Sequence, residues 1–210
     1  MSRRKTNVLL TGYGPFNSIL DNPSKALVSE IGKDFEDDPG SFDYNLETIT
    51  FPVSYRSVSE EMKCYYETGN IDYFIHLGVN ANSKYIILET EAEGYGYCLL
   101  DTEGNIPENK CCISYDPNAP QSLKSSLPLQ KICSEMNAKN DFYPIMLSTD
   151  PGKFLCSFLY YQTLYHSSKS VFIHVPNVGQ NDDSKFDDIL ITIRRIIDKI
   201  VCEGNELLNI

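Results

Sequence analysis

Hydrophobic residues along the chain fall into two kinds of segment. Short runs of mostly apolar residues are typical of buried strands, and longer segments with an apolar residue about every three or four positions are typical of helices. The short runs predict strands at residues 7–12, 44–53, 71–79, 85–89, 142–148 and 170–176. The periodic segments predict helices at residues 23–35, 54–67, 128–137, 151–166 and 185–202. Residues 90–120, rich in proline, glycine and polar residues, predict a loop with one possible strand at 111–115.

Local signals mark the ends of two of these helices. Asn22 precedes Pro23, and an asparagine cap followed by proline at the first helical position is a common helix start. Gly69 follows the second periodic segment, where glycine can adopt the left-handed conformation that ends a helix. Both signals support the helical interpretation independently of the hydrophobic pattern.

The order of the elements predicts the fold class. Strands and helices alternate without repeats or linkers, which predicts an α/β fold with helices on both faces of a parallel or mixed sheet. Ligands of such sheets gather at the carboxyl ends of the strands, so we expect these ends to meet at one rim. The predicted strand ends carry Tyr13, Gly78, Glu89, Ser148 and His174.

The composition is that of a globular protein with an acidic surface. The chain has 210 residues, of which 41% are hydrophobic and 22% charged, so we expect a single domain over residues 1–210. The formal net charge of −11 argues against nucleic acid as a partner, because phosphates would be repelled. We find no apolar segment of membrane-spanning length and no secretory signal pattern, so we expect no membrane partner.

Residue spacings along the chain argue against disulfides, a metal site and a dinucleotide site. The seven cysteines are odd in number and lie mostly among apolar residues, which is typical of reduced thiols in a cytoplasmic protein. The histidines lack metal-site spacing and no Cys-x-x-Cys occurs, so we expect no metal. The loop Gly12-Tyr13-Gly14-Pro15 lacks the third glycine of a dinucleotide site, and Pro15 removes a backbone donor.

The three histidines differ in their surroundings. His76 lies inside a hydrophobic strand, which indicates a hydrogen-bonded core histidine. His166 ends a predicted helix, where its charged form would interact favourably with the helix dipole. His174 lies near the end of a strand, and both a structural and a functional role are open for it.

Cys156 lies near the start of the predicted helix 151–166. The unpaired N–H groups and the dipole of a helix N-terminus stabilise a thiolate, and the same N–H groups can hold an oxyanion. With His174, Cys156 could form a nucleophile–base pair. A structural role is the alternative, because cysteine is often buried.

The order and spacing of several segments point to a known family. These segments are Val8–Phe16 with Asn22–Ser24, then Gly78–Glu89, Ser148–Cys156 and His174–Pro176. With this arrangement the chain resembles pyroglutamyl peptidase type I, the pyrrolidone-carboxylate cysteine peptidases, over nearly its whole length. The segments around Cys156 and His174 are the more specific ones.

The resemblance implies a function and a site. It makes Cys156 the nucleophile, His174 the base and Glu89 the acidic residue behind it, with Tyr13 and Phe16 as aromatic walls of a lactam pocket. The implied activity is that of a cysteine-type omega-peptidase, which hydrolyses the amide bond after an N-terminal pyroglutamyl residue through a thioester. The implied fold is a three-layer α/β/α sandwich without cofactor or metal. The implied partners are peptides with N-terminal pyroglutamate, and the oligomeric state stays open.

The chain departs from the family at the loop before Ile106-Pro107. The family usually has an arginine there, whereas this chain has Gly104 or Asn105, with Lys110 as the nearest cation. A weakened or inactive relative that binds modified peptide N-termini or a partner is therefore the alternative function. A nucleoside-phosphorylase-type transferase would rest on fold analogy alone.

Two smaller departures concern single residues. Pro151 stands where a small residue is usual, and proline suits the first turn of a helix. Tyr13 replaces the common phenylalanine and adds a hydroxyl to the pocket wall.

Overall fold

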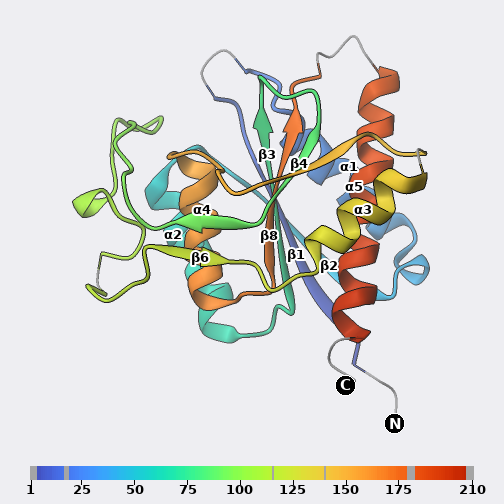
Figure 1. Cartoon of the computed structure of the whole chain (residues 1–210), viewed down its shortest axis with the longest axis horizontal. Helices are drawn as coiled ribbons and strands as arrows, with labels where there is room; N and C mark the ends of the chain where they lie inside the picture. Colours follow the sequence, from blue (N-terminus) through green and yellow to red (C-terminus); the bar gives the residue numbers. More distant parts are fainter. Residues whose placement is uncertain (1–3, 17–18, 115, 140, 179–182, 207–210) are drawn as a thin grey trace.

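A six-stranded sheet lies between two layers of helices in the computed structural model of the chain (Figure 1). The structure describes residues 4–16, 19–114, 116–139, 141–178 and 183–206. The strands of the sheet, in spatial order, are β2 (Tyr44–Phe51), β1 (Thr6–Tyr13), β3 (Tyr73–Asn80), β8 (Ser170–Pro176), β4 (Ile86–Glu89) and β7 (Ile145–Ser148).

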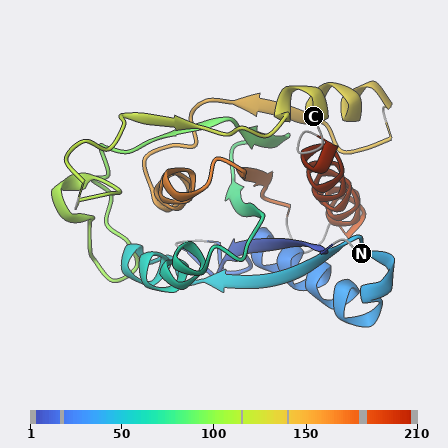
Figure 2. The same cartoon turned by 90° about the horizontal axis from the view of Figure 1, so that it is seen from below.

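Each face of the sheet has its own hydrophobic core. One face packs against α1 (Pro23–Asp37), α3 (Leu129–Lys139) and α5 (Asp183–Glu206), and the other against α2 (Tyr55–Thr68) and α4 (Leu155–His166). In Figure 2, α4 and α5 lie on opposite sides of the central strands. Successive strand residues alternate between the cores, so Leu10 belongs to the first and Leu9 to the second. The predicted α/β/α sandwich is confirmed.

The sheet is mixed, and this changes where the strand ends lie. β1, β2, β3 and β8 are parallel to one another, whereas β4 is antiparallel to β8 and parallel to β7. The carboxyl ends of β4 and β7 therefore point away from those of the other strands. The prediction that all strand ends meet at one rim is wrong for Glu89 and Ser148.

The region between residues 90 and 120 is mainly loop, as predicted, but its secondary structure differs. β5 (Glu91–Glu93) pairs antiparallel with β6 (Ser122–Lys124) in a separate two-stranded sheet. The prediction of a possible strand at 111–115 is wrong for residues 111–114, which form no strand, and Tyr115 lies outside the described residues. Asn109 and Lys110 have left-handed φ angles of 53° and 56°, which break the extended chain before Cys111.

The predicted helix ends are confirmed in α1 and α2. Asn22 caps α1 by accepting a hydrogen bond from the Ser24 amide, and Pro23 is its first residue. Gly69 ends α2 with a φ of 62°. The prediction that this helix begins at Pro151 is wrong. Gly152 has a left-handed φ angle of 82°, and α4 begins only at Leu155.

Two histidines lie outside the candidate site. His76 is fully buried between the hydroxyls of Thr11 and Thr163, at 2.8 and 3.0 Å, and burial lowers its pKa to about 3, as expected for a core histidine. His166 does end α4, but burial lowers its pKa and its ring stacks on Tyr66 at 4.2 Å. The predicted charge–dipole interaction at His166 is therefore not supported.

The seven cysteines are free in the structure. Within the residues described, no helix combines the length and the apolar character needed to cross a membrane.

Candidate active site

The first turn of α4 holds Cys156 beside the sheet. Phe154 precedes the helix with an extended backbone, at a φ angle of −137°, and its side chain does not cap the helix. Leu155 is the first helical residue and Cys156, which is half-buried, is the second. In this position the positive end of the helix dipole favours a negatively charged thiolate. The late start of α4 thus places Cys156 closer to the helix N-terminus than the sequence analysis predicted.

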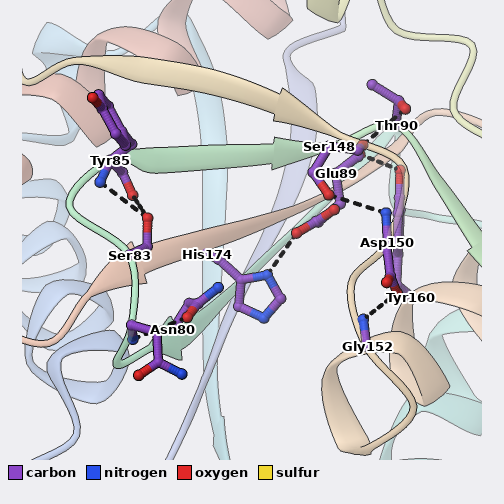
Figure 3. Close-up of polar contacts among 11 residues, drawn as sticks. Asn80, Ser83, Tyr85, Glu89, Thr90, Ser148, Asp150, Gly152, Tyr160 and His174 are labelled. Atoms are coloured by element: carbon purple, nitrogen blue, oxygen red, sulfur yellow. Dashed lines mark hydrogen bonds and ion pairs between the residues drawn. The ribbon is translucent and has the colours of Figure 1, made fainter.

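His174 and Glu89 meet across the antiparallel strands β8 and β4. Ile87 is the register partner of His174 and Glu89 that of Phe172, so all four side chains project from the same face of the sheet. Oε1 of Glu89 lies 2.8 Å from Nδ1 of His174, as Figure 3 shows. The two side chains are nearly inaccessible to solvent, with 1% of Glu89 and 6% of His174 exposed. The carboxylate therefore fixes the orientation of the imidazole in a site that water barely reaches.

Cys156 and His174 come together above Gly78. Gly78 is the register partner of His174 in the parallel pair β3–β8. A Cβ atom on Gly78 would lie 3.0 Å from Sγ of Cys156 and 2.7 Å from the Phe172 ring. The absence of a side chain at Gly78 is thus what allows the thiol to lie against the sheet next to His174.

The charges of this group favour a protonated histidine. Burial alone would lower the pKa of His174, but the Cys156 thiolate, by charge and hydrogen bonding, and the Glu89 carboxylate raise it to about 9. At neutral pH His174 is therefore an imidazolium. In this state the imidazolium can donate a proton to a leaving amine.

The backbone of Glu89 is tied to α4. The hydroxyl of Tyr160 on α4 donates to the Glu89 carbonyl at 2.8 Å, which ties β4 to the helix that carries Cys156. Within the described residues, Oε2 of Glu89 is buried and has no hydrogen-bond partner. Among the described residues, the Glu89 carboxylate thus has His174 as its hydrogen-bond partner.

A small apolar pocket of about 90 Å³ opens next to the thiol. Its described lining residues are Tyr13, Phe16, Asn22, Val53, Val79, Phe154, Leu155 and Cys156. The rings of Phe16 and Phe154 lie 5.1 Å apart, and the Tyr13 hydroxyl is directed away to the Leu155 carbonyl, to which it donates at 3.0 Å. The pocket thus presents flat apolar surfaces to a ligand. Larger cavities of about 590 and 520 Å³ lie elsewhere, and Cys156, His174 and Glu89 are not among their described lining residues.

The structure brings all five predicted site residues into this region and adds others. Cys156, His174 and Glu89 form one group, and Tyr13 and Phe16 line the adjoining pocket. Phe154 and Gly78 were not predicted as site residues. The sequence did contain a signal for each, since Phe154 is two residues before Cys156 and Gly78 lies near the end of a hydrophobic strand.

The loop that lacks the family arginine forms a tight turn around Asp101. Oδ1 of Asp101 accepts hydrogen bonds from the amides of Glu103 and Asn105, and Oδ2 accepts one from the Tyr55 amide. Gly104, at the tip, has a left-handed φ of 79°, which explains a glycine there. The positively charged Lys110 is exposed and does not line the described part of the pocket.

No group of three or more histidine, cysteine or acidic side chains within the described residues could hold a metal ion.

Comparison with known proteins supports one family. The model of the pyroglutamyl peptidase family matches residues 6–199. Human pyroglutamyl-peptidase 1 is 28% identical over 202 residues, which are 96% of this chain and 92% of the human protein. Pyrrolidone-carboxylate peptidase of Pyrococcus furiosus is 28% identical over 180 residues, or 82% of each chain. The crystal structure of pyrrolidone carboxyl peptidase from Fervidobacterium islandicum is similar, with a TM-score of 0.76 and 25% identity over 93% of this chain and 98% of that one.

Proposed function

The chain belongs to the pyroglutamyl peptidase family, and from this we propose that it is a cysteine peptidase that removes pyroglutamate from the N-terminus of peptides. The observation that carries the proposal is the group of half-buried Cys156 with buried His174 and Glu89, beside an apolar pocket. In this arrangement a thiol can act as the nucleophile, an imidazole as the acid and base, and a carboxylate as the group that orients the imidazole.

In the first half of the reaction, the Cys156 thiolate attacks the carbonyl carbon of the pyroglutamyl residue and forms a tetrahedral intermediate. The N–H groups of the first turn of α4 stabilise the oxyanion. The carbon–nitrogen bond then breaks, and His174 donates its proton to the leaving amine. The products of this half are the shortened peptide and a pyroglutamyl thioester on Cys156.

In the second half, water hydrolyses the thioester. Neutral His174 takes a proton from the water as it attacks the thioester carbonyl, while Glu89 stabilises the imidazolium that forms. Collapse of this second intermediate breaks the carbon–sulfur bond. Pyroglutamate leaves, and the thiolate–imidazolium pair is restored.

The pocket accounts for selection of an uncharged ring. Tyr13, Phe16 and Phe154 offer aromatic surface to a flat lactam, whose nitrogen carries no charge. An ordinary N-terminal residue has an ammonium group, whose transfer from water into this pocket would be costly. The pocket therefore favours pyroglutamate over free N-termini.

Hydrolysis of a pyroglutamyl amide with a fluorescent leaving group tests the proposal. We expect release of the fluorophore in reducing buffer and its loss in Cys156→Ala. Cys64→Ala is the matched control, because Cys64 is exposed on α2 and its removal should leave turnover unchanged. Mass spectrometry after acid quenching should find the pyroglutamyl group on Cys156.

The alternative function is an outcome of the same experiment. If the wild-type protein binds a pyroglutamyl aldehyde but turns over no amide, the chain is a non-catalytic binder of modified peptide ends. The loop at Gly104 and Asn105, where the family arginine is missing, is the observation that favours this outcome. Iodoacetamide offers an independent test, because one of the seven cysteines should be alkylated much faster than the others. A fast site other than Cys156 would contradict the proposed nucleophile.

A further inference from the structure

The residues on both sides of Cys156 are attached to one neighbouring segment, residues 93–97. Before the helix, the ammonium of Lys153 forms an ion pair with the Glu93 carboxylate. After the nucleophile, the Ser157 hydroxyl lies 2.9 Å from the Tyr97 hydroxyl. Cys156 is thus held between two contacts to the same piece of chain.

The directions of the hydrogen bonds at Tyr97 follow from its partners. The Tyr97 hydroxyl lies 2.5 Å from the Glu93 carbonyl, which can only accept, so Tyr97 is the donor in that bond. A hydroxyl has one hydrogen, so Ser157 donates to the Tyr97 oxygen. Both Tyr97 and Ser157 are fully buried, with 0% exposed, and water does not compete for these bonds. The hydrogen bonds therefore run in one direction: Ser157, in the first turn of α4, donates to Tyr97, and Tyr97 donates to the backbone carbonyl of Glu93 in β5.

The Tyr97 ring adds two contacts to the same turn. It packs edge-on against Phe158, with ring centroids 5.6 Å apart, and Nζ of Lys153 lies 5.9 Å from the Tyr97 ring centroid. Lys153, Ser157 and Phe158 therefore all rest on one fully buried side chain. Tyr97 thus contacts the start of α4 through its hydroxyl and through its ring.

We propose that Tyr97 is a positioning residue that sets the orientation of the Cys156 thiolate through its bond to Ser157. This inference rests on the proposed function, because it assigns a role in that reaction. Tyr97 does not line the described part of the pocket, so its effect should fall on the chemical step rather than on substrate binding.

Tyr97→Phe tests the inference, because it removes the hydroxyl and keeps the ring. We expect kcat for a pyroglutamyl amide to fall about tenfold with KM unchanged, since small misplacements of reacting groups cost rate steeply. Alkylation of Cys156 by iodoacetamide at neutral pH should slow as well. Tyr95→Phe is the matched control, because its hydroxyl bonds to the Ala119 carbonyl within the same loop region rather than to α4.

A second variant separates positioning from general stability. Ser157→Ala should also lower kcat, and the double variant should be no worse than Tyr97→Phe alone, because Tyr97→Phe already removes the bond to Ser157. Thermal unfolding of each variant is measured in parallel, and an unchanged kcat in folded Tyr97→Phe overturns the inference. If the wild-type protein hydrolyses no pyroglutamyl amide, the proposed function fails. The alkylation rates then decide the role of Tyr97, with equal rates in wild type and Tyr97→Phe overturning it.

Discussion

Gly78 lies directly beneath the thiol of Cys156, so close that a Cβ atom at this glycine would lie 3.0 Å from Sγ. The same Cβ would lie 2.7 Å from the Phe172 ring, and Gly78 is paired in register with His174. A missing side chain on β3 therefore makes room for a nucleophile from α4 and a histidine from β8. The φ angle of Gly78 is not in the left-handed region, so space rather than backbone conformation requires glycine here.

Gly78→Ala should abolish most of the activity while leaving the fold intact. The added methyl group must displace the thiol or the Phe172 ring, and a displaced nucleophile costs about 100-fold in kcat. Overpacking should also lower the free energy of unfolding by about 1–3 kcal/mol. Gly40→Ala is the control, because the added Cβ atom would lie 3.5 Å from its nearest neighbour, Oδ1 of Asp38, which is an ordinary contact distance. Full activity in Gly78→Ala would show that the thiol is not held as described.

The pKa of His174 predicts how stability and activity change at high pH. It lies at about 9 in the folded protein, against 6.5 for an ordinary histidine. A raised pKa contributes stability that is fully present below pH 6.5 and is lost as the pH rises through 9, on the order of 3 kcal/mol in total. Urea unfolding of wild type and His174→Asn between pH 6 and 10 measures this, and the difference between the two proteins should shrink toward pH 10. The kcat/KM of the wild-type protein should fall above pH 9, when the imidazolium is lost.

Glu89→Gln should weaken catalysis and move the alkaline limit of activity to lower pH. Glutamine can still accept the hydrogen bond from Nδ1 of His174, but its loss of charge removes support for the imidazolium and lowers the pKa of His174. We expect a fall in kcat of roughly 10- to 100-fold, smaller than the effect of a wrong tautomer. Glu91→Gln, which removes only a contact with Lys124, is the control and should match wild type. An unshifted alkaline limit in Glu89→Gln would contradict this role of the carboxylate.

The fold was largely predictable because its central strands are buried on both faces. β8 is buried along its whole length and its predicted ends, Ser170 and Pro176, are those observed. The short strands β5 and β6 were not predicted, because three polar or mixed residues carry no periodic signal and their pairing spans residues distant in sequence. The direction of β4 could not be predicted either, because its hydrophobic pattern is the same whether it runs parallel or antiparallel to β8.

The candidate site was predictable where its residues are chemically distinctive. Cys156, His174 and Glu89 stand out as a thiol, an imidazole and a carboxylate at the ends of predicted elements. Gly78, Phe154 and Tyr97 contribute space, surface and a remote hydroxyl, and glycines and aromatic residues with such roles look the same in sequence as those in any core. Their contribution depends on contacts between distant segments, which only the folded chain brings together.

Tyr13→Phe should have little effect on catalysis, although Tyr13 lines the pocket. Its hydroxyl points to the Leu155 carbonyl rather than toward a ligand, so phenylalanine keeps the same aromatic wall. We expect kcat/KM within about threefold of wild type, and a free energy of unfolding lower by about 1 kcal/mol from the lost buried hydrogen bond. A large rise in KM would instead show that the hydroxyl contacts the substrate.

Phe16→Ala should have the opposite profile, because it removes the wall itself. The Phe16 ring packs against Phe154 at 5.1 Å and is only partly buried, so its loss opens the pocket without emptying the core. We expect kcat/KM for a pyroglutamyl amide to fall roughly 10- to 200-fold, the range for lost apolar contacts in a specificity pocket, mainly through KM. Phe35→Ala removes a ring of similar burial from α1 that packs on Phe42, outside the described pocket lining, and is the matched control for stability. If Phe16→Ala and Phe35→Ala leave KM equally unchanged, the pocket beside Cys156 does not bind the lactam ring.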